Sequence, residues 1–307
     1  MSKVRAEVLV IGGGAAGMSA ALAASAYADV TVVDDNPMLG GQIWRAELGK
    51  IKSPDAKRLV EQVNSGKVNI INNAQVFGSD SHGCLLAETP DGTIELTFEK
   101  LILATGARER FLPFPGWTLP NVLGAGGLQA MVKGGLNIAD KRVVVAGTGP
   151  LLLAVADHLK AKGAKVICIA EQAPASKIRG FALGLWRFPA KIAQGVALRM
   201  RLRDVPYWTD SWVTDCVNDD ETTHTISVTV SQSGVARTLE CDLLACGFHL
   251  VPNTEVAAVL GCRIDDGTVR VDEFQQTSIA NIYCAGEPTG IGGVEASLIE
   301  GKIAGLA

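Results

Sequence analysis

The stretch Val8-Leu9-Val10-Ile11-Gly12-Gly13-Gly14-Ala15-Ala16-Gly17 decides the fold of this chain. Four apolar residues lead into three glycines and then into a run of small residues, which is the order of a buried strand, a tight turn and a helix. In such a turn Gly12 permits the sharp bend, Gly14 lets the backbone approach a pyrophosphate, and Gly17 lets the helix lie close to the sheet. The helix N-terminus then offers unpaired N–H groups to phosphate oxygens.

A carboxylate follows at the distance that a dinucleotide site requires. The run Val30-Thr31-Val32-Val33 is typical of the next strand and ends at Asp34, about 20 residues beyond the glycines, where an acidic side chain holds ribose hydroxyls. A glycine-rich turn alone can be purely structural, so this second element carries the interpretation. The two together predict a dinucleotide-binding domain.

The same order of elements occurs a second time. A strand pattern leads into Gly147-Thr148-Gly149, a helix follows, and the next strand at 165–169 leads to Glu171. A β-meander comes next, with strands expected at 226–230 and 237–241, and it closes in a turn of small residues, as in the first half. We therefore predict an α/β fold with two Rossmann-like, three-layer nucleotide-binding domains, each with a β-meander, the second inserted into the first.

Two features set the domain boundaries. The stretch 111–120 is rich in proline and aromatic residues, cannot form a helix, and is typical of a crossing between domains. The last segment returns to the first domain, because another strand ends in Gly286-Glu287 ahead of a glycine-started helix. The boundaries expected are 1–120 and 249–307 for the first domain and 121–248 for the second.

The second copy departs from the first in one position. Leu152 stands where the third glycine is expected, so the helix must lie farther from its sheet, and the binding of NAD there is left open. Its acidic residue, Glu171, suits a ribose 2′-hydroxyl better than a 2′-phosphate.

The second domain also contains a basic insertion at residues 176–205. It has no acidic residue before Asp204 and interleaves basic with apolar side chains. Its basic residues are Lys177, Arg179, Arg187, Lys191, Arg199, Arg201 and Arg203. One interpretation is a pair of surface helices with a solvated basic face; the other is a docking surface for another subunit or for an anionic cofactor.

Composition excludes several classes of function. The 307 residues suffice for two domains, and the formal net charge of −4 does not indicate nucleic acid as a partner. The seven cysteines include no CxxC pair, which argues against a disulfide framework, a metal site and a dithiol redox centre. Glu7 and the first glycines interrupt a signal-like start, and no apolar run could span a bilayer. We expect a reduced, cytoplasmic setting.

With these motifs in view, the chain resembles the flavoproteins with two dinucleotide-binding domains, the thioredoxin reductase and glutathione reductase superfamily. The resemblance implies FAD in the first domain and leaves NAD or another nucleotide open in the second. Gly41 and Gln42 would pass near the pyrophosphate and flavin, Val76 would touch adenine with its backbone, and Gly286-Glu287 matches a Gly-Asp pair that binds the ribityl chain. Glutamate in place of aspartate requires the side chain to retract or the strand end to shift. The residues implied for FAD are Gly12, Gly14, Ala15, Ala16, Gly17, Asp34, Asp35, Gly41, Gln42, Val76, Ala104, Thr105, Gly106, Gly286 and Glu287, and those for NAD are Gly147, Gly149 and Glu171.

A closer resemblance rests on Gly40–Arg45, Ala104–Arg110 with Pro113–Pro120, Gly147–Leu153 and Cys246–Phe248. These segments are similar to the FAD-carrying α-type subunits of hetero-oligomeric amine dehydrogenases, which include opine oxidase, hydrogen cyanide synthase, dye-linked proline and hydroxyproline dehydrogenases and the sarcosine oxidase α subunit. The resemblance implies a hetero-oligomer in which a β-type flavoprotein subunit oxidises the amine, with FMN or an iron–sulfur centre on partner subunits. Relatives often continue into a cysteine-rich iron–sulfur segment; we expect that centre to be absent here, truncated, or carried by another, small subunit.

Three functions follow as alternatives. The first is an electron-transfer subunit whose partner oxidises a proline-, hydroxyproline-, sarcosine- or opine-like substrate. The second is a stand-alone NAD(P)H-dependent flavoprotein reductase of a small electron acceptor, and the third is a flavin-bound scaffold without activity. No catalytic residue is assigned, because none of the four histidines (82, 158, 224 and 249) stands in the pattern of a substrate base.

Overall fold

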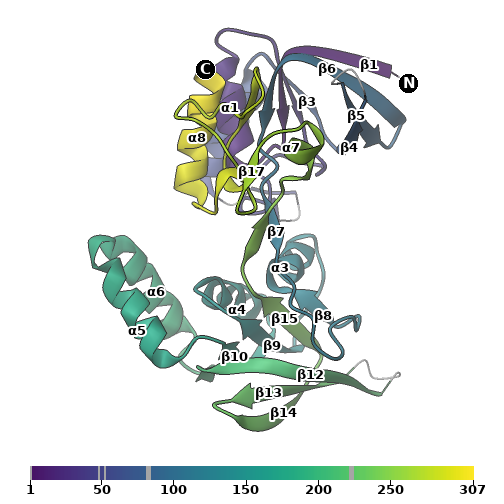
Figure 1. The fold of residues 1–307 in the computed structure, drawn as a ribbon. Helices are drawn as coiled ribbons and strands as arrows, with labels where there is room; N and C mark the ends of the chain where they lie inside the picture. Colours follow the sequence, from purple (N-terminus) through teal and green to yellow (C-terminus); the bar gives the residue numbers. More distant parts are fainter. Residues whose placement is uncertain (1, 48, 52, 81–83, 221–224) are drawn as a thin grey trace. The chain divides into compact units, whose positions relative to one another are not determined.

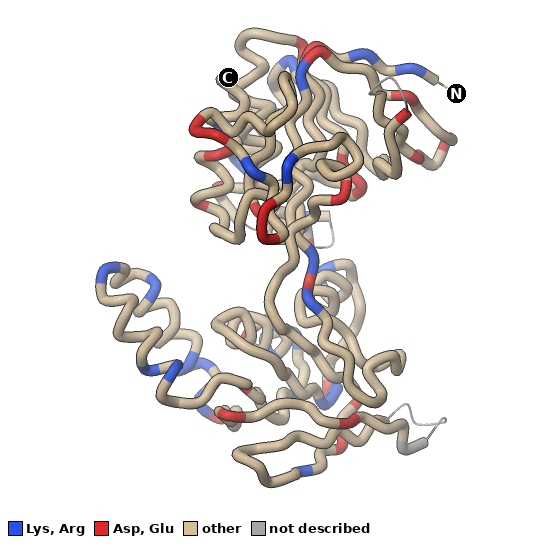
Figure 2. The backbone as a smooth tube through the Cα atoms, viewed as in Figure 1, with Lys and Arg blue, Asp and Glu red and all other residues tan. Residues whose placement is uncertain are grey.

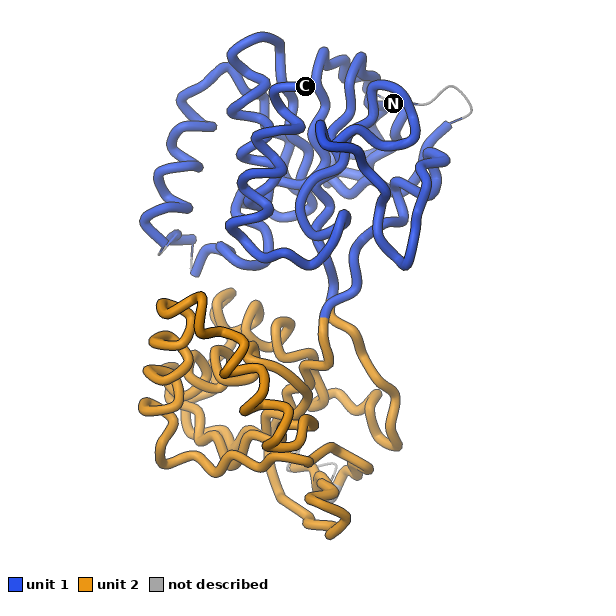
Figure 3. The backbone as a smooth tube through the Cα atoms, turned by 60° about the vertical axis from the view of Figure 1, so that its left-hand side comes forward, with its two compact units in different colours: residues 1–108, 250–307 blue, residues 109–249 orange. Residues whose placement is uncertain are grey.

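The computed structural model describes the chain except residues 1, 48, 52, 81–83 and 221–224, and it contains two compact units (Figures 1 and 3). Unit 1 comprises Met1–Arg108 and Leu250–Ala307, and unit 2 comprises Glu109–His249. The α/β class and the insertion of one Rossmann-like unit into another are confirmed.

The proline-rich stretch belongs to unit 2. Its Pro115 carbonyl accepts the N–H of Cys216 at 2.9 Å, and Phe111, Phe114 and Leu119 pack against the core of that unit. The structure thus places residues 109–120 with the second unit, whereas the sequence led us to expect them at the end of the first domain's opening segment. The physical reason is that these aromatic side chains pack against apolar residues in the core of unit 2.

Unit 1 is a three-layer structure around one sheet. Its strand order is β3-β2-β1-β6-β5-β4, with β19 beside β6; β1 pairs in parallel with β2 and β6, and β4, β5 and β6 form an antiparallel meander. Its elements are β1 (Ser2–Ile11), α1 (Ala15–Ala24), β2 (Val30–Val33), α2 (Pro54–Ser65), β3 (Val68–Ile71), β4 (Gln75–Ser79), β5 (Leu85–Thr89), β6 (Gly92–Leu103), β7 (Ala107–Glu109), β16 (Leu250–Pro252), α7 (Glu255–Val259), β17 (Ile264–Asp265), β18 (Thr268–Val269), β19 (Ile282–Cys284), η2 (Glu287–Thr289) and α8 (Val294–Leu306).

Alternation along β1 divides the core of unit 1. Leu9 and Ile11 face the side of the meander, whereas Val8 and Val10 face α1 and α8. The two helices lie side by side (Figure 1) because small residues line their contact: a side chain at Gly301 would overlap the carbonyl oxygen of Ala16. This close packing fixes the start of α1, where the first glycine turn lies.

Unit 2 repeats the three layers. Its parallel sheet has the order β11-β10-β9-β15-β8; the antiparallel sheet β12-β13-β14 packs on one face, and α3 and α4 pack on the other. Its elements are β8 (Val122–Gly124), α3 (Ala125–Lys133), β9 (Arg142–Gly147), α4 (Leu151–Ala161), β10 (Lys165–Glu171), α5 (Ala175–Gly184), η1 (Leu185–Arg187), α6 (Pro189–Arg201), β11 (Tyr207–Trp208), β12 (Ser211–Asp220), β13 (Thr225–Gln232), β14 (Val235–Cys241) and β15 (Leu243–Gly247). The two expected hairpin strands correspond to β13 and β14; the sequence reasoning missed β12, which completes the meander.

Within the described residues, no helix combines the length and the apolar character needed to cross a membrane. The predicted cytoplasmic setting stays a prediction.

Candidate functional site

The first glycine turn lies between β1 and α1 and can be formed only by glycine at two of its positions. Gly12 has φ +105°, and a side chain there would overlap the carbonyl oxygen of Ala104 at the end of β6. A side chain at Gly17 would overlap the carbonyl oxygen of Gly12. The turn therefore packs closely against the end of β6, and this contact places the start of α1 at the carboxyl edge of the sheet.

The start of α1 leaves four backbone donors open. Gly14 is the N-cap residue, no side chain caps the helix, and the first helical backbone bond runs from the Met18 N–H to the Gly14 carbonyl at 2.9 Å. The N–H groups of Gly14, Ala15, Ala16 and Gly17 therefore have no hydrogen-bond partner among the described residues. Four adjacent donors at the positive end of a helix fit a pyrophosphate.

A second backbone segment without side chains runs beside this helix start. Gly40 donates its N–H to the Gly13 carbonyl at 2.9 Å, and a Cβ on Gly41 would stand 2.9 Å from the Cα of Gly14. The predicted positions of Gly41 and Gln42 next to the glycine turn agree with this geometry. The two backbones lie too close together for a side chain at Gly41.

Arg45 carries an unmet donor at this place, and the sequence reasoning did not assign it to the site. Its Nη2 donates to Gln42 Oε1 at 3.1 Å, while its Nε is buried and has no hydrogen-bond partner among the described residues. A buried guanidinium N–H without an acceptor indicates that an anionic or carbonyl group belongs beside it. In the sequence, the signal that could have identified Arg45 is its position at the end of a glycine-rich turn.

Asp34 lies where the sequence placed it, at the end of β2, and is 5% exposed. Its carboxylate accepts the N–H of Gly13 and, at 2.7 and 2.9 Å, the backbone and side-chain N–H groups of Asn36. Oδ1 accepts both Asn36 N–H groups, whereas Oδ2 accepts only the Gly13 N–H and keeps a lone pair for a ribose hydroxyl. Desolvation, followed by the adjacent Asp34 carboxylate, raises the pKa of the neighbouring Asp35.

The third wall of the site comes from Ala104–Gly106 and the return segment. Thr105 Oγ1 donates to the Asn253 carbonyl at 2.6 Å, and Asn253 Nδ2 donates to the Thr105 carbonyl at 2.9 Å. Gly286 has φ +83°, and a Cβ on it would stand 2.9 Å from the Cβ of Ala16. These contacts bring two segments that are far apart in the sequence to the start of α1.

Glu287 follows Gly286 and is half-buried. Desolvation raises the pKa of its carboxyl, and no described residue donates a hydrogen bond to it. The turn itself is held by Glu300 of α8, which accepts the Gly286 N–H at 2.8 Å and the Thr289 hydroxyl at 3.1 Å. The sequence reasoning did not include Glu300, although an acid in an otherwise small and apolar helix was a usable signal. Val76 lies half-buried on β4, and its adenine contact stays a prediction.

The second glycine turn begins like the first and then differs. A side chain at Gly147, with φ +145°, would overlap the Gly247 carbonyl, just as one at Gly12 would overlap that of Ala104. Glu171, however, is 2% exposed and turns toward the loop: it accepts the Thr148 hydroxyl at 2.8 Å and the N–H groups of Gly149 and Ala173, both at 2.9 Å. The protein's own carboxylate thus occupies donors that would bind a phosphate.

The remaining donors of this turn are also lost. Pro150 has no N–H, and the Leu152 N–H bonds to the Gly149 carbonyl at 3.2 Å. Of the four positions that correspond to Gly14–Gly17, Leu151 alone has an N–H without a partner among the described residues. Its side chain is exposed, whereas that of Leu152 is wholly buried in the helix–sheet core. The second turn therefore leaves one backbone N–H open where the first leaves four, which fits a pyrophosphate poorly. The contact of Glu171 with a ribose hydroxyl stays a prediction.

Other reactive side chains do not form a second centre. All seven cysteines are free, and burial raises the pKa of Cys168, Cys241 and Cys246 to about 12, as expected of structural thiols. No cluster of metal-ligating side chains occurs in the part of the chain that the structure describes. His158 lies on α4 and His249, with φ +103°, on the crossing between the units, while His82 and His224 lie outside the described residues.

Comparison with known proteins identifies the family. The family described as "pyridine nucleotide-disulphide oxidoreductase" matches residues 6–301 of this chain. The chain belongs to this family. Its members are oxidoreductases, and membership implies FAD and a pyridine nucleotide; the first glycine turn fits the former, whereas the second fits the latter poorly.

Individual relatives include subunits of larger enzymes. The chain is 30% identical to the hydrogen cyanide synthase subunit HcnB of Pseudomonas aeruginosa, over 97% of this chain and 70% of that protein. It is 29% identical to an opine oxidase subunit of Agrobacterium tumefaciens, over 98% of this chain and 65% of that protein. The fold is similar to that of T. acidophilum thioredoxin reductase, with a TM-score of 0.73 and 23% identity over 98% of this chain and 97% of that one. The resemblance read from the motifs is confirmed.

Proposed function

We propose that this chain is the FAD-binding electron-transfer subunit of a hetero-oligomeric amino-acid or amine dehydrogenase or oxidase. The observation that carries the proposal is the difference between the two glycine turns: four open backbone donors in the first against one in the second. A chain that holds a flavin but lacks a fitting site for NADH must receive its electrons from elsewhere. Its relatives from hydrogen cyanide synthase and opine oxidase are themselves named as subunits, which supports a partner as that source.

Bound FAD supplies the capacity to accept and pass on electrons, and the contribution of the protein is to bind and orient it. In this proposal the N–H groups of Gly14–Gly17 hold the pyrophosphate and Asp34 holds the adenosine ribose. Arg45 Nε and the Glu287 carboxyl are the two polar groups left to bind the rest of the cofactor. Burial raises the pKa of the Glu287 carboxyl, which favours the protonated form that can donate a hydrogen bond.

The amine substrate is proposed to bind to a partner flavoprotein subunit. Proline-, hydroxyproline-, sarcosine- and opine-like compounds remain the substrate classes that the resemblance suggests.

The alternative is a stand-alone NAD(P)H-dependent reductase of a small electron acceptor. The family description, which includes a pyridine nucleotide, favours it. The engaged Glu171 carboxylate, the missing N–H of Pro150 and the buried Leu152 argue against it.

Anaerobic rapid mixing of the FAD-loaded chain with NADH and NADPH separates the two proposals. We expect no flavin bleaching within seconds, and full bleaching when dithionite is the reductant. Rapid, saturable bleaching by either nucleotide would establish the alternative. Amine-dependent bleaching that occurs only after a co-purifying flavoprotein subunit is added would support the electron-transfer role directly.

A further inference from the structure

The helical hairpin α5–η1–α6 is the least covered part of unit 2. None of the residues of these three elements is buried. Figure 1 shows α5 and α6 extending away from the sheet of unit 2, with only the end of α6 beside α4. A pair of helices that buries no side chain lacks the packing that ordinarily stabilises helices in proteins.

The apolar side chains of this hairpin face solvent along its whole length. Seven large ones are between 38% and 76% exposed: Phe181, Leu183, Trp186, Phe188, Ile192, Val196 and Met200. At these exposures the seven side chains together offer on the order of 800 Å² of apolar surface, about what one partner contributes to a standard protein–protein interface.

The hairpin also carries charge of one sign. Between Glu171 and Asp204 the sequence has seven basic and no acidic residues, although the whole chain has a net charge of −4. Figure 2 shows Lys and Arg, and no Asp or Glu, along both helices. An occupant of this surface must therefore bring carboxylates together with apolar side chains.

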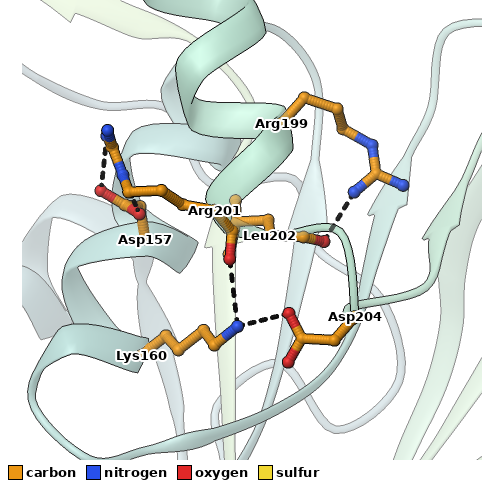
Figure 4. Close-up of polar contacts among 6 residues, drawn as sticks. All are labelled: Asp157, Lys160, Arg199, Arg201, Leu202 and Asp204. Atoms are coloured by element: carbon orange, nitrogen blue, oxygen red, sulfur yellow. Dashed lines mark hydrogen bonds and ion pairs between the residues drawn. The ribbon is translucent and has the colours of Figure 1, made fainter.

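Two of the seven basic residues hold the hairpin in place and are not free for a partner. Arg201 donates to both oxygens of Asp157 on α4 at 2.8 and 2.9 Å, and Lys160 donates to the Arg201 carbonyl at 3.1 Å and pairs with Asp204 (Figure 4). Arg199 donates to the Leu202 carbonyl at 2.6 Å and lies over the ring of Tyr207. The base of α6 is thus fixed while its outer face remains uncovered.

A hollow of about 380 Å³ opens beside this fixed base, lined by Val196, Arg199, Met200 and Arg203. Its walls combine apolar and cationic groups, so a protruding apolar side chain next to a carboxylate fits it.

We infer that the α5–η1–α6 hairpin is the docking surface for a second, different protein subunit that presents an apolar groove flanked by carboxylates. This inference rests on the proposed function, which requires such a subunit. The occupant buries Trp186 and its apolar neighbours at the tip, while acidic groups of the partner pair with Lys177, Arg187 and Arg203, three exposed basic residues that take no part in the anchor described above.

The test uses the full chain with a photo-reactive residue at Trp186 or, separately, at Val196, expressed in its own cells. Val235, an exposed residue on β14 of the same unit, serves as the control position. The cross-linked product is identified by mass spectrometry, and the identified protein is then purified with the chain. Its Kd is measured for the parent, for the triple variant Lys177→Glu/Arg187→Glu/Arg203→Glu, and for a charge-matched control in unit 1, Arg58→Glu/Lys67→Glu/Lys302→Glu.

The inference predicts that one protein is captured at both hairpin positions and not at Val235. It further predicts that the hairpin triple variant raises the Kd about 10-fold or more, while the control stays within about twofold. Thermal unfolding and FAD content of the hairpin variant must match those of the parent, since Arg199 and Arg201 are left intact.

Several outcomes would overturn the inference: cross-links to a second copy, cross-links to unit 1 of the same chain, no cross-link at either position, or an unchanged Kd. Flotation of the parent, but not of the hairpin variant, with vesicles of phosphatidylglycerol and phosphatidylcholine would assign the surface to a membrane instead. Bleaching of the flavin by NADH is recorded on the same samples. Rapid bleaching by NADH would overturn the proposed function but would not affect a docking surface that the cross-links had confirmed.

Discussion

The two glycine turns of this chain have similar backbone geometry but differ in how many backbone N–H groups are free to bind a phosphate. In both, a glycine with positive φ presses on the carbonyl at the end of a neighbouring strand, and a buried carboxylate from the following strand accepts a loop N–H. In the first turn four donors remain open at the start of α1; in the second, Glu171, Pro150 and Leu152 leave one. The same turn geometry therefore occurs with open backbone donors in one unit and with mostly engaged donors in the other.

The largest expected effect separates the two turns at their glycines. Gly12→Ala forces a side chain into the Ala104 carbonyl at positive φ, so we expect a loss of about 3 kcal/mol or more in the free energy of unfolding and loss of bound FAD. Gly149→Ala, also at positive φ but with no atom near the added Cβ, is expected to cost about 1–2 kcal/mol and to retain FAD. Thermal unfolding and flavin absorbance per chain measure both. Equal loss of FAD in the two variants would remove the distinction.

Leu152, at the position of the third glycine of the first turn, contributes to the core of unit 2. Because its side chain is wholly buried between α4 and the sheet, Leu152→Ala should lower the free energy of unfolding by about 2–5 kcal/mol. Leu151→Ala, at an exposed position of the same helix, is the matched control and should change it by less than about 0.5 kcal/mol. Urea unfolding of the FAD-free chain measures the difference. The FAD affinity of both variants should equal that of the parent, and a large change in it would argue that the second unit contributes to the flavin site.

The two strand-end carboxylates offer a finer comparison. Asp34→Asn should weaken FAD binding about 10- to 100-fold, because a charge-assisted hydrogen bond to the ribose is lost. Glu171→Gln should leave the FAD Kd unchanged and lower the free energy of unfolding by about 1–3 kcal/mol, since it disturbs three short bonds within the loop. Fluorescence titration with FAD and thermal unfolding of each variant test the pair, and a shift in FAD affinity caused by Glu171→Gln would contradict the assignment.

The smallest expected effect concerns pH and has no counterpart in the second turn. Burial raises the pKa of Glu287 above its ordinary value of 4.5, so in the folded FAD-free chain this carboxyl is protonated at a higher pH than in the unfolded chain. The ionised form therefore costs stability as the pH rises above that value, and the cost vanishes below it. Glu287→Gln should unfold a few degrees above the parent at pH 8 and at the same temperature as the parent near pH 4. An equal difference at both pH values would show that burial of this charge is not the cause.

Much of the fold could be predicted from short patterns. The glycines at 12–17 and 147–149, the following acids and the return at Gly286 fix two nested nucleotide-binding units, because each pattern has one local structural solution. The strand β12 escaped prediction since its alternation of apolar and polar residues is irregular, and its pairing with β13 contains register shifts. The position of residues 109–120 escaped because their aromatic residues are placed by partners far along the chain, such as Cys216.

The candidate site was predictable in its glycines and less so in its polar groups. The departure at Leu152 was visible, but the hydrogen bonds that Glu171 accepts from Thr148 and Gly149 depend on tertiary contacts. Likewise, Arg199 and Arg201 count as part of a uniform basic face in the sequence. In the structure Arg201 binds Asp157 of α4 and Arg199 lies over the ring of Tyr207, so both connect α6 to the rest of unit 2. Which partner a charged side chain chooses is decided by geometry that spacing alone does not contain.

Equilibrium binding tests the central claim most directly, because its stoichiometry shows how many of the two glycine turns bind a nucleotide. Isothermal titration of the FAD-free chain with FAD, and of the FAD-loaded chain with NADH and NADPH, compares the two turns in one protein. The account predicts one FAD per chain with a Kd of about 1 μM or tighter, and no saturable heat from either pyridine nucleotide up to about 1 mM. Binding of NADH or NADPH at one per chain with a micromolar Kd, abolished by Gly149→Ala, would contradict it.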